Sequence, residues 1–249
     1  MMKKKKGIFS PLPVALLSAS ALLLLGSSVG SARAALTYYS ENYAAEVTVS
    51  SIGVSLMENG KVVAARDYSH KNDQWNVKSE KLLEDTFADG KMVPGKVYTE
   101  NLSVTNSGSI DSYVRVTLYK SWMDEKGNKV TTLSPDLIKL EGLGQNGWVI
   151  DESASTEERT VLYYTGVVPA GGSTPSLTNT ISVDNSIADK VEKIEGADGT
   201  ITYKYKYDGY SFHLEAEVDA VQTHSAEDAI KSAWGVDVNV AEDGTLSLR

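Results

Sequence analysis

The sequence predicts an all-β protein, a jelly roll or β-sandwich, with one short helix near its C-terminus. Several segments alternate apolar and polar residues with a period of two, as strands with one buried face do. Turn dipeptides separate these segments, and each contains a residue that tolerates positive φ: Asn59-Gly60, Gly127-Asn128, Asp198-Gly199 and Asp208-Gly209. Many short strands with frequent turns are typical of sandwiches and jelly rolls.

The clearest alternation lies in two segments. In 113–119 the apolar positions are Val114, Val116 and Leu118, and in 211–220 they run from Phe212 to Ala220. We expect Val116 and Leu118 to be buried in the core.

Three further strands are expected. They lie around Leu102 and Val104, over 161–168, and over 201–207, where Tyr and Lys alternate as in an amphipathic edge strand. Residues 97–105 and 113–122 are expected to pair as an antiparallel hairpin, because Pro94-Gly95 starts a strand and Asn106 with Gly108 favours a reversal.

Two helices are expected. Ser134-Pro135 is typical of a helix start and opens a short segment through Leu140. The second helix is stronger: Ser225 is placed as its N-cap, and Gly235 ends it. One face of that helix is apolar, through Ala226, Ala229, Ile230, Ala233 and Trp234. We expect it to cover an open end or edge of the sandwich.

The predicted globular domain spans residues 51–235, and residues 236–249 form a polar C-terminal tail. The Asp243-Gly244 turn leaves open whether this tail is an added hairpin or disordered. Before the domain, residues 35–50 have Val47 and Val49 at odd positions, whereas the next segment has Ile52, Val54 and Leu56 at even positions. A strict period of two cannot accommodate both sets, so the segment either contains a β-bulge or is a separate strand.

Residues 1–34 have the pattern of a signal peptide. A run of four Lys at 3–6 precedes an apolar stretch at 14–25, and Ala32 and Ala34 satisfy the small-residue rule before a cleavage site at Ala35. The alternative is an uncleaved N-terminal anchor. No later segment is apolar enough to span a membrane, so any membrane contact is expected only through the uncleaved leader.

Composition excludes several classes of function. The chain has 249 residues, no Cys and three His, which removes thiolate metal sites and thiol nucleophiles. Its net charge is −9; the leader holds five of the 24 basic residues and none of the 33 acidic residues, so the cleaved chain carries −14. This charge argues against nucleic acid as a partner.

Several motifs together resemble the TasA/camelysin family. After the leader comes Leu36-Thr37-Tyr38-Tyr39-Ser40, similar to leaders cut by the SipW-type signal peptidase. Downstream are Met92-Val93-Pro94-Gly95 and then the series Val104-Thr105-Asn106-Ser107-Gly108 and Tyr113-Val114-Arg115-Val116. The C-terminal Val221-Gln222-Thr223-His224 and the helix of 226–235 also resemble the ending of such proteins.

The resemblance implies a jelly-roll fold and a secreted protein of a Gram-positive cell surface or biofilm matrix. We expect this protein not to be an enzyme. It also implies subunits that assemble into fibres by lending an N-terminal strand to a neighbour. Here that strand is 35–50, with Leu36, Tyr38, Val47 and Val49 as the side chains that enter the neighbour. The expected partners are further copies of the chain, a SipW-type signal peptidase and accessory matrix proteins. No catalytic residue, cofactor or metal ligand is assigned.

Two other functions stay open. Some camelysin relatives are catalogued as surface metallopeptidases, but His70, His213 and His224 do not have the spacing of a His-Glu-x-x-His zinc motif. A row of His213, Glu215, Glu217 and Asp219 on one strand face suits a hard cation such as Ca²⁺, or simply a solvated sheet face. A monomeric adhesion or carbohydrate-binding module is the second alternative, because Tyr-rich strands can stack on sugars.

The cleavage site is directly testable. We expect the secreted protein to begin at Ala35 or Leu36, because Ala32 and Ala34 occupy the positions that the peptidase reads. The intact mass of the secreted protein measures this. A mass that retains the four Lys of 3–6 would show an uncleaved anchor instead.

Overall fold

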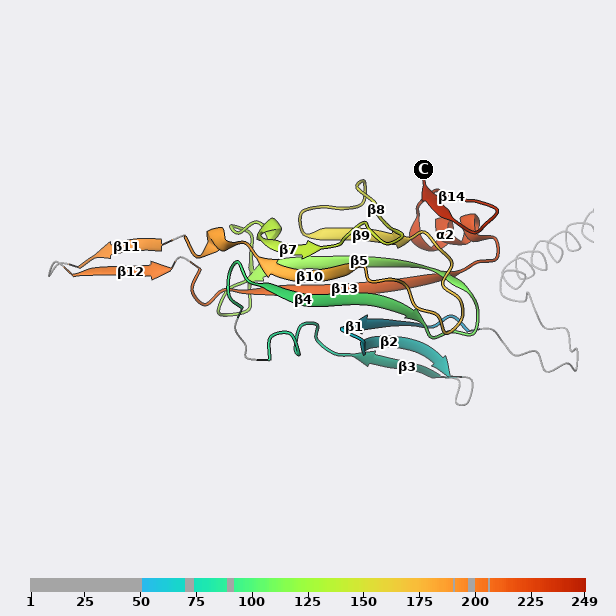
Figure 1. Cartoon of the computed structure of the whole chain (residues 1–249), viewed down its shortest axis with the longest axis horizontal. Coiled ribbons are helices and arrows are strands. Elements are labelled where there is room, and N and C mark those ends of the chain that lie inside the picture. Colours follow the sequence, from blue (N-terminus) through green and yellow to red (C-terminus); the bar gives the residue numbers. More distant parts are fainter. Residues whose placement is uncertain (1–50, 70–73, 89–91, 190, 197–199, 206) are drawn as a thin grey trace, which may run out of the picture. The chain divides into compact units, whose positions relative to one another are not determined.

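The computed structural model describes residues 51–69, 74–88, 92–189, 191–196, 200–205 and 207–249. Two antiparallel sheets form a β-sandwich, with one short α-helix near the C-terminus (Figure 1). The predicted fold class, all-β with a C-terminal helix, is confirmed.

The first sheet has six strands in the order β3-β2-β1-β4-β10-β7. Its strands are β1 (Val54–Glu58), β2 (Lys61–Ser69), β3 (Gln74–Ser79), β4 (Val97–Asn106), β7 (Ile138–Glu141) and β10 (Thr178–Val183). The register between β1 and β2 shifts between Leu56 and Met57, so this pair contains a β-bulge.

The second sheet is narrower, with the order β13-β5-β9-β8, and β6 also pairs with β5. Its strands are β5 (Ser112–Met123), β6 (Lys129–Val130), β8 (Trp148–Ile150), β9 (Arg159–Tyr164) and β13 (Ser211–Gln222). The hairpin of β11 (Val191–Glu195) and β12 (Ile201–Tyr205) is a separate sheet of two strands. The expected alternation in 201–207 thus belongs to a strand whose Ile201 and Tyr203 are exposed.

The main core lies between the two sheets. Leu102 and Val104 of β4 pack with Val116 and Leu118 of β5 and with Leu162 of β9, and all are at most 2% exposed. The strands predicted from alternation around these residues, and over Phe212–Ala220, are confirmed. Burial of these apolar side chains is the main favourable contribution to folding.

β5 is buried on both faces at its beginning. The side chains that point away from the main core include Tyr113 of β5 and Tyr163 of β9, which are 2% and 1% exposed. The helix α2 (Ala226–Trp234) covers them with Ile230, and the ring of Trp234 lies 5.5 Å from that of Tyr163. The predicted helix is confirmed, and it covers the outer face of the second sheet over Tyr113 and Tyr163.

The start of α2 differs from the predicted cap. Ser225 has φ 49° and ψ 47°, and its side chain makes no capping hydrogen bond. An N-cap side chain reaches the first helical amides from an extended backbone, which Ser225 does not have. Gly235 ends the helix with φ 72°, as predicted.

Residues 238–248 form a hairpin of β14 (Val238–Val240) and β15 (Leu246–Leu248). Val238 and Leu246 are 2% and 1% exposed and complete the outer core around α2. The Tyr113 hydroxyl donates to the Gly244 carbonyl at 2.7 Å. Of the two alternatives for the tail, the structure has the hairpin.

The predicted hairpin of 97–105 with 113–122 is wrong. β4 pairs with β1 and β10 in the first sheet, whereas β5 pairs with β13 and β9 in the second. The chain therefore crosses between sheets at 106–111, and Asn106 holds this crossing. Its buried side-chain amide donates to the carbonyls of Ile110 (2.8 Å) and Val168 (2.9 Å), which belong to different loops.

Two further boundaries differ from the prediction. The helix expected over 134–140 is only a 3₁₀ turn, Pro135–Leu137, in which the amide of Asp136 donates to Ser134 Oγ at 3.2 Å. Ile138 then enters β7, because its buried side chain joins the core beside β10. The strand expected over 161–168 ends at Tyr164, and Val168 makes an isolated bridge to Ser112.

Three of the turn dipeptides adopt positive φ as expected. Asn59 and Gly60 join β1 to β2 with φ 49° and 84°, and Gly127 and Gly209 have φ 78° and 81°. The fourth dipeptide, Asp198-Gly199, lies outside the described residues.

The core assignment gives a stability prediction. Replacing Val116 or Leu118 with Ala is expected to cost about 2–4 kcal/mol of unfolding free energy, through lost burial and a residual cavity. Glu217→Ala, on the exposed face of β13, is the control and is expected to change it by less than about 0.5 kcal/mol. Chemical denaturation measures all three. A larger loss from Glu217→Ala would mean that the acidic row on β13 has a specific role.

Candidate assembly groove

The free edge of β13 is the first part of the candidate site. β13 has 12 residues and pairs only with β5 among the strands that the structure describes. A long edge strand presents unpaired backbone N–H and C=O groups to any chain that lies beside it. Such an edge is the usual acceptor for an added strand.

A mostly apolar groove opens beside this edge. Its volume is about 1490 Å³, and its lining includes Leu56 and Val63 of the first sheet and Phe212 and Ala216 of β13. Residues 80–88, here called the wall segment, contribute Leu82, Leu83 and Phe87. The groove arises because the first sheet has more strands than the second, so part of its inner face is not covered by a strand.

An aromatic cluster lines one part of the groove. The Phe87 ring lies 4.8 Å from that of Tyr98 and 6.0 Å from that of Phe212, both edge-on, and Phe212 also packs edge-on against Trp122. The Trp122 indole donates to the Ser134 carbonyl at 3.0 Å, which satisfies its polar atom. The cluster therefore joins the wall segment, the first sheet and β13 through edge-to-face contacts.

Two buried carboxyl groups attach the wall segment to the first sheet. Glu58 is 5% exposed and accepts a 2.6 Å hydrogen bond from the backbone N–H of Leu83. Glu100 is 0% exposed and accepts from the Thr86 hydroxyl at 3.1 Å, while its Oε1 has no hydrogen-bond donor. Leu83 itself has φ 70°, an unfavourable conformation for a residue with a branched side chain, so these contacts hold strained backbone.

The two carboxyl groups affect each other. The pKa of Glu100 is raised to about 8, first by burial and then by the neighbouring Glu58 through a hydrogen bond and its charge, although hydrogen bonds from Thr86 and Asn59 oppose the shift. The alternation of apolar and polar residues already indicates that these two carboxyl groups are buried. Glu58 shares its strand face with buried Leu56, and Glu100 shares its face with buried Leu102, so both carboxyls sit at core positions.

The described chain begins at the crossing between the sheets. The Ser51 N–H donates to Ser109 Oγ at 2.8 Å, and the Ser51 carbonyl accepts from the Ser109 N–H at 2.8 Å. Gly108 permits this approach, because a Cβ there would lie 2.5 Å from the Ser51 carbonyl oxygen. The Asn-x-Gly motif thus fixes the point at which residues 35–50 join the domain.

This joining point and the aromatic part of the groove lie at opposite ends of β4. Val54 pairs with Asn106 at one end of β4, whereas Ser182 pairs with Val97 at the other, next to groove residue Val183. β4 has ten residues, so the two ends are roughly 30 Å apart at the usual strand rise. In Figure 1, β1 likewise begins at the end of the sandwich away from the β11–β12 hairpin.

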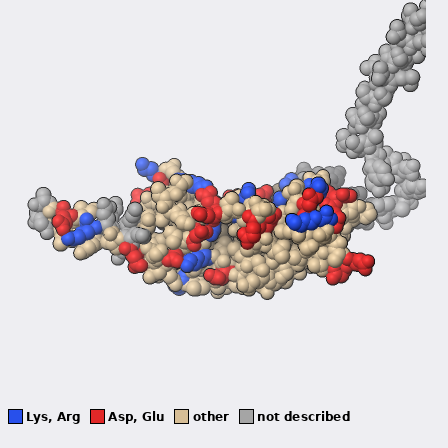
Figure 2. Space-filling view, turned by 90° about the horizontal axis from the view of Figure 1, so that it is seen from above, with Lys and Arg blue, Asp and Glu red and all other residues tan. Residues whose placement is uncertain are grey.

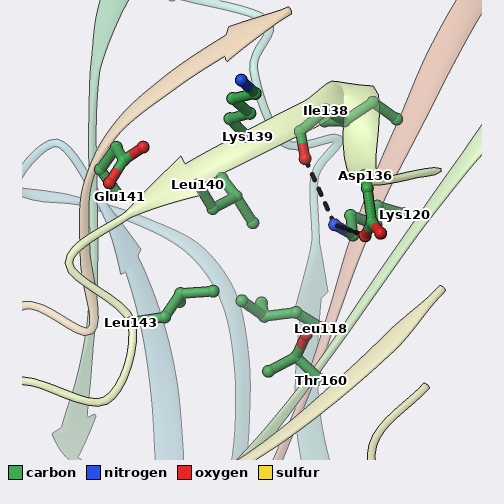
Figure 3. A pocket seen from close by; sticks show the side chains of 9 residues that line it. All are labelled: Leu118, Lys120, Asp136, Ile138, Lys139, Leu140, Glu141, Leu143 and Thr160. Carbon is green, nitrogen blue, oxygen red and sulfur yellow. Dashed lines mark hydrogen bonds and ion pairs between the residues drawn. The ribbon is translucent and has the colours of Figure 1, made fainter. Parts of the chain in front are cut away.

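A second, smaller opening of about 270 Å³ lies between β5 and β7 (Figure 3). Leu118, Leu140 and Leu143 face it, and the Lys120 ammonium donates to the Asp136 carboxylate and the Ile138 carbonyl, both at 3.3 Å. Lys139 pairs instead with Asp184. The two Lys ammonium groups of this opening are therefore paired with Asp side chains, and the carboxylate of Glu141 is the other charged group in its lining.

The acidic row of β13 does not gather into a cation site. The side chains of His213 and Glu215 are 55% and 67% exposed, and Asp219 is paired with Arg115, whose Nε donates to it at 2.9 Å. The Tyr119 hydroxyl donates to Glu217 at 3.4 Å. Within the described ranges, no group of three or more His, Cys, Asp or Glu residues is placed to hold a metal ion.

The surface charges and the helices add two observations. On the face drawn in Figure 2, Lys and Arg lie among Asp and Glu and do not form a continuous basic surface. Of the helices that the structure describes, none has the length and apolar character needed to cross a membrane.

The other predicted site residues fall outside the structure. The cleavage residues Ala32, Ala34 and Ala35, and the assembly-strand residues Leu36, Tyr38, Val47 and Val49, are not among the described residues, nor is the junction at Ser50. The leader, the donated strand and the choice between bulge and separate strand therefore stay predictions. The groove that such a strand would enter was not predicted from the sequence.

Comparisons with known proteins found no counterpart. No family model, no curated protein and no solved structure matches this chain. The resemblance to the TasA/camelysin family therefore stays a prediction based on its motifs.

Proposed function

We propose that this protein is a secreted structural subunit that assembles into, or decorates, extracellular matrix fibres. Each copy donates residues 35–50 as a strand to the groove of a second copy. The observation that carries this proposal is the unpaired edge of β13 beside a mostly apolar groove.

The length of the segment supports the proposal. Residues 35–50 number 16 and span up to roughly 50 Å when extended. The 12 residues of β13 span roughly 40 Å. The segment is therefore long enough to pair along the whole edge, with Val47 and Val49 among the side chains that fill the groove.

Strand direction favours a second copy over self-insertion. β13 runs toward the crossing, because Gln222 at its end pairs with Ser112. A chain's own segment must end at Ser51, beside Ser109, so it would run parallel to β13. Every strand pair in the described structure is antiparallel, and a segment from a second copy is free to approach in that direction.

The resulting contact is head-to-tail. The segment joins the domain at one end of β4, and the aromatic part of the groove lies at the other end. A contact between two different surfaces repeats without closing, which produces a filament. The net charge of −14 opposes the approach of subunits, so growth is expected to quicken with added salt.

Deletion of residues 35–50 from the cleaved protein tests the donor. We expect the cleaved full-length protein to form fibres in negative-stain micrographs and the deletion variant to elute as a folded monomer in size-exclusion chromatography. Fibres from the deletion variant at the wild-type rate would disprove donation by this segment. A cleaved wild-type protein that stays monomeric with 35–50 protected from proteolysis would show self-insertion instead.

A matched pair of variants on β13 tests the acceptor. Ala216→Arg places a long charged side chain in the groove, whereas Glu217→Arg places the same side chain on the opposite, exposed face of the strand. We expect Ala216→Arg to reduce fibre growth at least about tenfold, since burying an unpaired charge costs more than the roughly 1.4 kcal/mol that a factor of ten represents. Circular dichroism confirms that both variants are folded. Equal growth of the two variants would exclude this groove as the acceptor.

A further inference from the structure

The wall segment of the groove is attached through the two buried carboxyl groups of Glu58 and Glu100. Glu58 binds the Leu83 N–H and Glu100 binds the Thr86 hydroxyl, so both hydrogen bonds end on the wall segment. Asn59 completes the attachment: its side-chain amide donates to Thr86 at 3.3 Å, and its Oδ1 accepts from the Asn101 N–H at 2.9 Å.

Two adjacent carboxylates without solvent cannot both carry a charge at low cost. One nearby cation is Lys61, whose pKa is raised mainly by Asp85 and to a smaller extent by the charge of Glu58. Lys61 of β2 is 70% exposed and forms an ion pair with Asp85 of the wall segment. The other charged residues of the wall segment, Glu80, Lys81 and Glu84, are exposed. On β4 the titratable Tyr98 shares the strand face of Glu100, and its hydroxyl accepts from the Val93 N–H at 2.9 Å. The unpartnered Oε1 of Glu100 marks the place where a proton belongs.

We propose that the Glu58–Glu100 pair holds one proton and acts as a switch that fastens the wall segment to the first sheet. With the proton present, one carboxyl donates to the other and both keep their contacts with Leu83 and Thr86. Without it, the two negative charges repel, the hydrogen bond from Leu83 weakens, and the strained wall segment detaches. Acidic to neutral conditions therefore keep the groove wall formed, and alkaline conditions loosen it.

The direction in which stability changes with pH follows from the linkage between proton binding and folding. The pKa of Glu100 is raised to about 8, from the usual 4.5 of a free Glu side chain. Between these two values the folded protein holds one more proton than the unfolded chain, so stability falls as pH rises through this range. The stabilising effect is complete below the unfolded value and is lost as pH passes the folded value.

Amide hydrogen exchange at Leu83 tests the switch in the cleaved full-length protein. After correction for the intrinsic pH dependence of exchange, we expect the Leu83 protection factor to fall about tenfold or more between pH 6 and pH 9, since pH 9 is one unit above the raised pKa. In Glu100→Gln, which keeps an oxygen for Thr86 but carries no charge, the same factor is expected to change less than about threefold. Glu58→Gln is a second neutral variant and is expected to behave alike.

Asp85→Asn is the matched control, because Asp85 is a carboxylate of the same segment whose side chain is 67% exposed. It is expected to keep the wild-type pH dependence. Constant protection in the wild type from pH 6 to pH 9, or an unchanged pH dependence in both Gln variants, would overturn the switch. Restoration of protection at pH 9 by Ca²⁺ or Mg²⁺ in the wild type but not in Glu100→Gln would also overturn it, because a cation would then be the natural occupant.

The consequence for assembly rests on the proposed function and is measured separately. A synthetic peptide of residues 35–50 is expected to bind the deletion variant, once that variant is shown to fold, more weakly at pH 9 than at pH 6. In Glu100→Gln the two affinities are expected to agree within about threefold. A Leu83 amide that responds to pH while the peptide binds at neither pH would retain the switch and reject the proposed function. A peptide that binds equally at both pH values would limit the switch to stability alone and overturn its control of the groove.

Discussion

The crossing of the chain from one sheet to the other at Asn106 is the constraint on which the rest of the structure depends. The buried Asn106 amide binds the carbonyls of Ile110 and Val168, and so ties together two loops at the end of the sandwich. This crossing places β4 and β5 in facing sheets, so the apolar sides of both strands meet in the core. At the same crossing the Ser51 carbonyl accepts a hydrogen bond from the Ser109 N–H, and the absence of a side chain at Gly108 allows this close approach.

The unequal widths of the sheets have a direct consequence for function. Six strands face a narrower sheet that ends at β13, so an apolar surface and a row of unpaired backbone groups lie next to each other. Natural proteins usually protect such an edge by shortening, charging or covering it. Here Glu217 of β13 lies on the exposed face and Asp219 pairs with Arg115, while His213 and Glu215 border the groove. The edge of β13 is unpaired among the described strands. The proposed strand donation combines the backbone groups and the apolar surface in one contact.

Polar contacts hold the wall of the groove in addition to the apolar contacts of Leu83 and Phe87. Leu83 adopts a left-handed backbone conformation, and the carboxyl of Glu58 accepts its N–H. Glu100 is fully buried beside it. Buried polar groups that are only partly satisfied are sensitive to a single proton, because the low dielectric strengthens each interaction and each repulsion alike. The wall is thus the part of the domain in which the proposed switch acts.

The sequence by itself determined the strands around Val116 and Leu102, the helix that ends at Gly235, and the all-β class, because period and turn chemistry are local properties. The tertiary structure decided which strands are partners. Asn106 and Gly108 indicated a reversal, but a turn within one sheet and a crossing between two use the same residue types. Ile138 belongs to a strand and not to the expected helix, because it pairs with β10. The C-terminal tail forms a hairpin because the side chains of Val238 and Leu246 are buried in the outer core. The groove and the Glu58–Glu100 pair exist only where segments distant in sequence meet, and no local pattern specifies such a meeting.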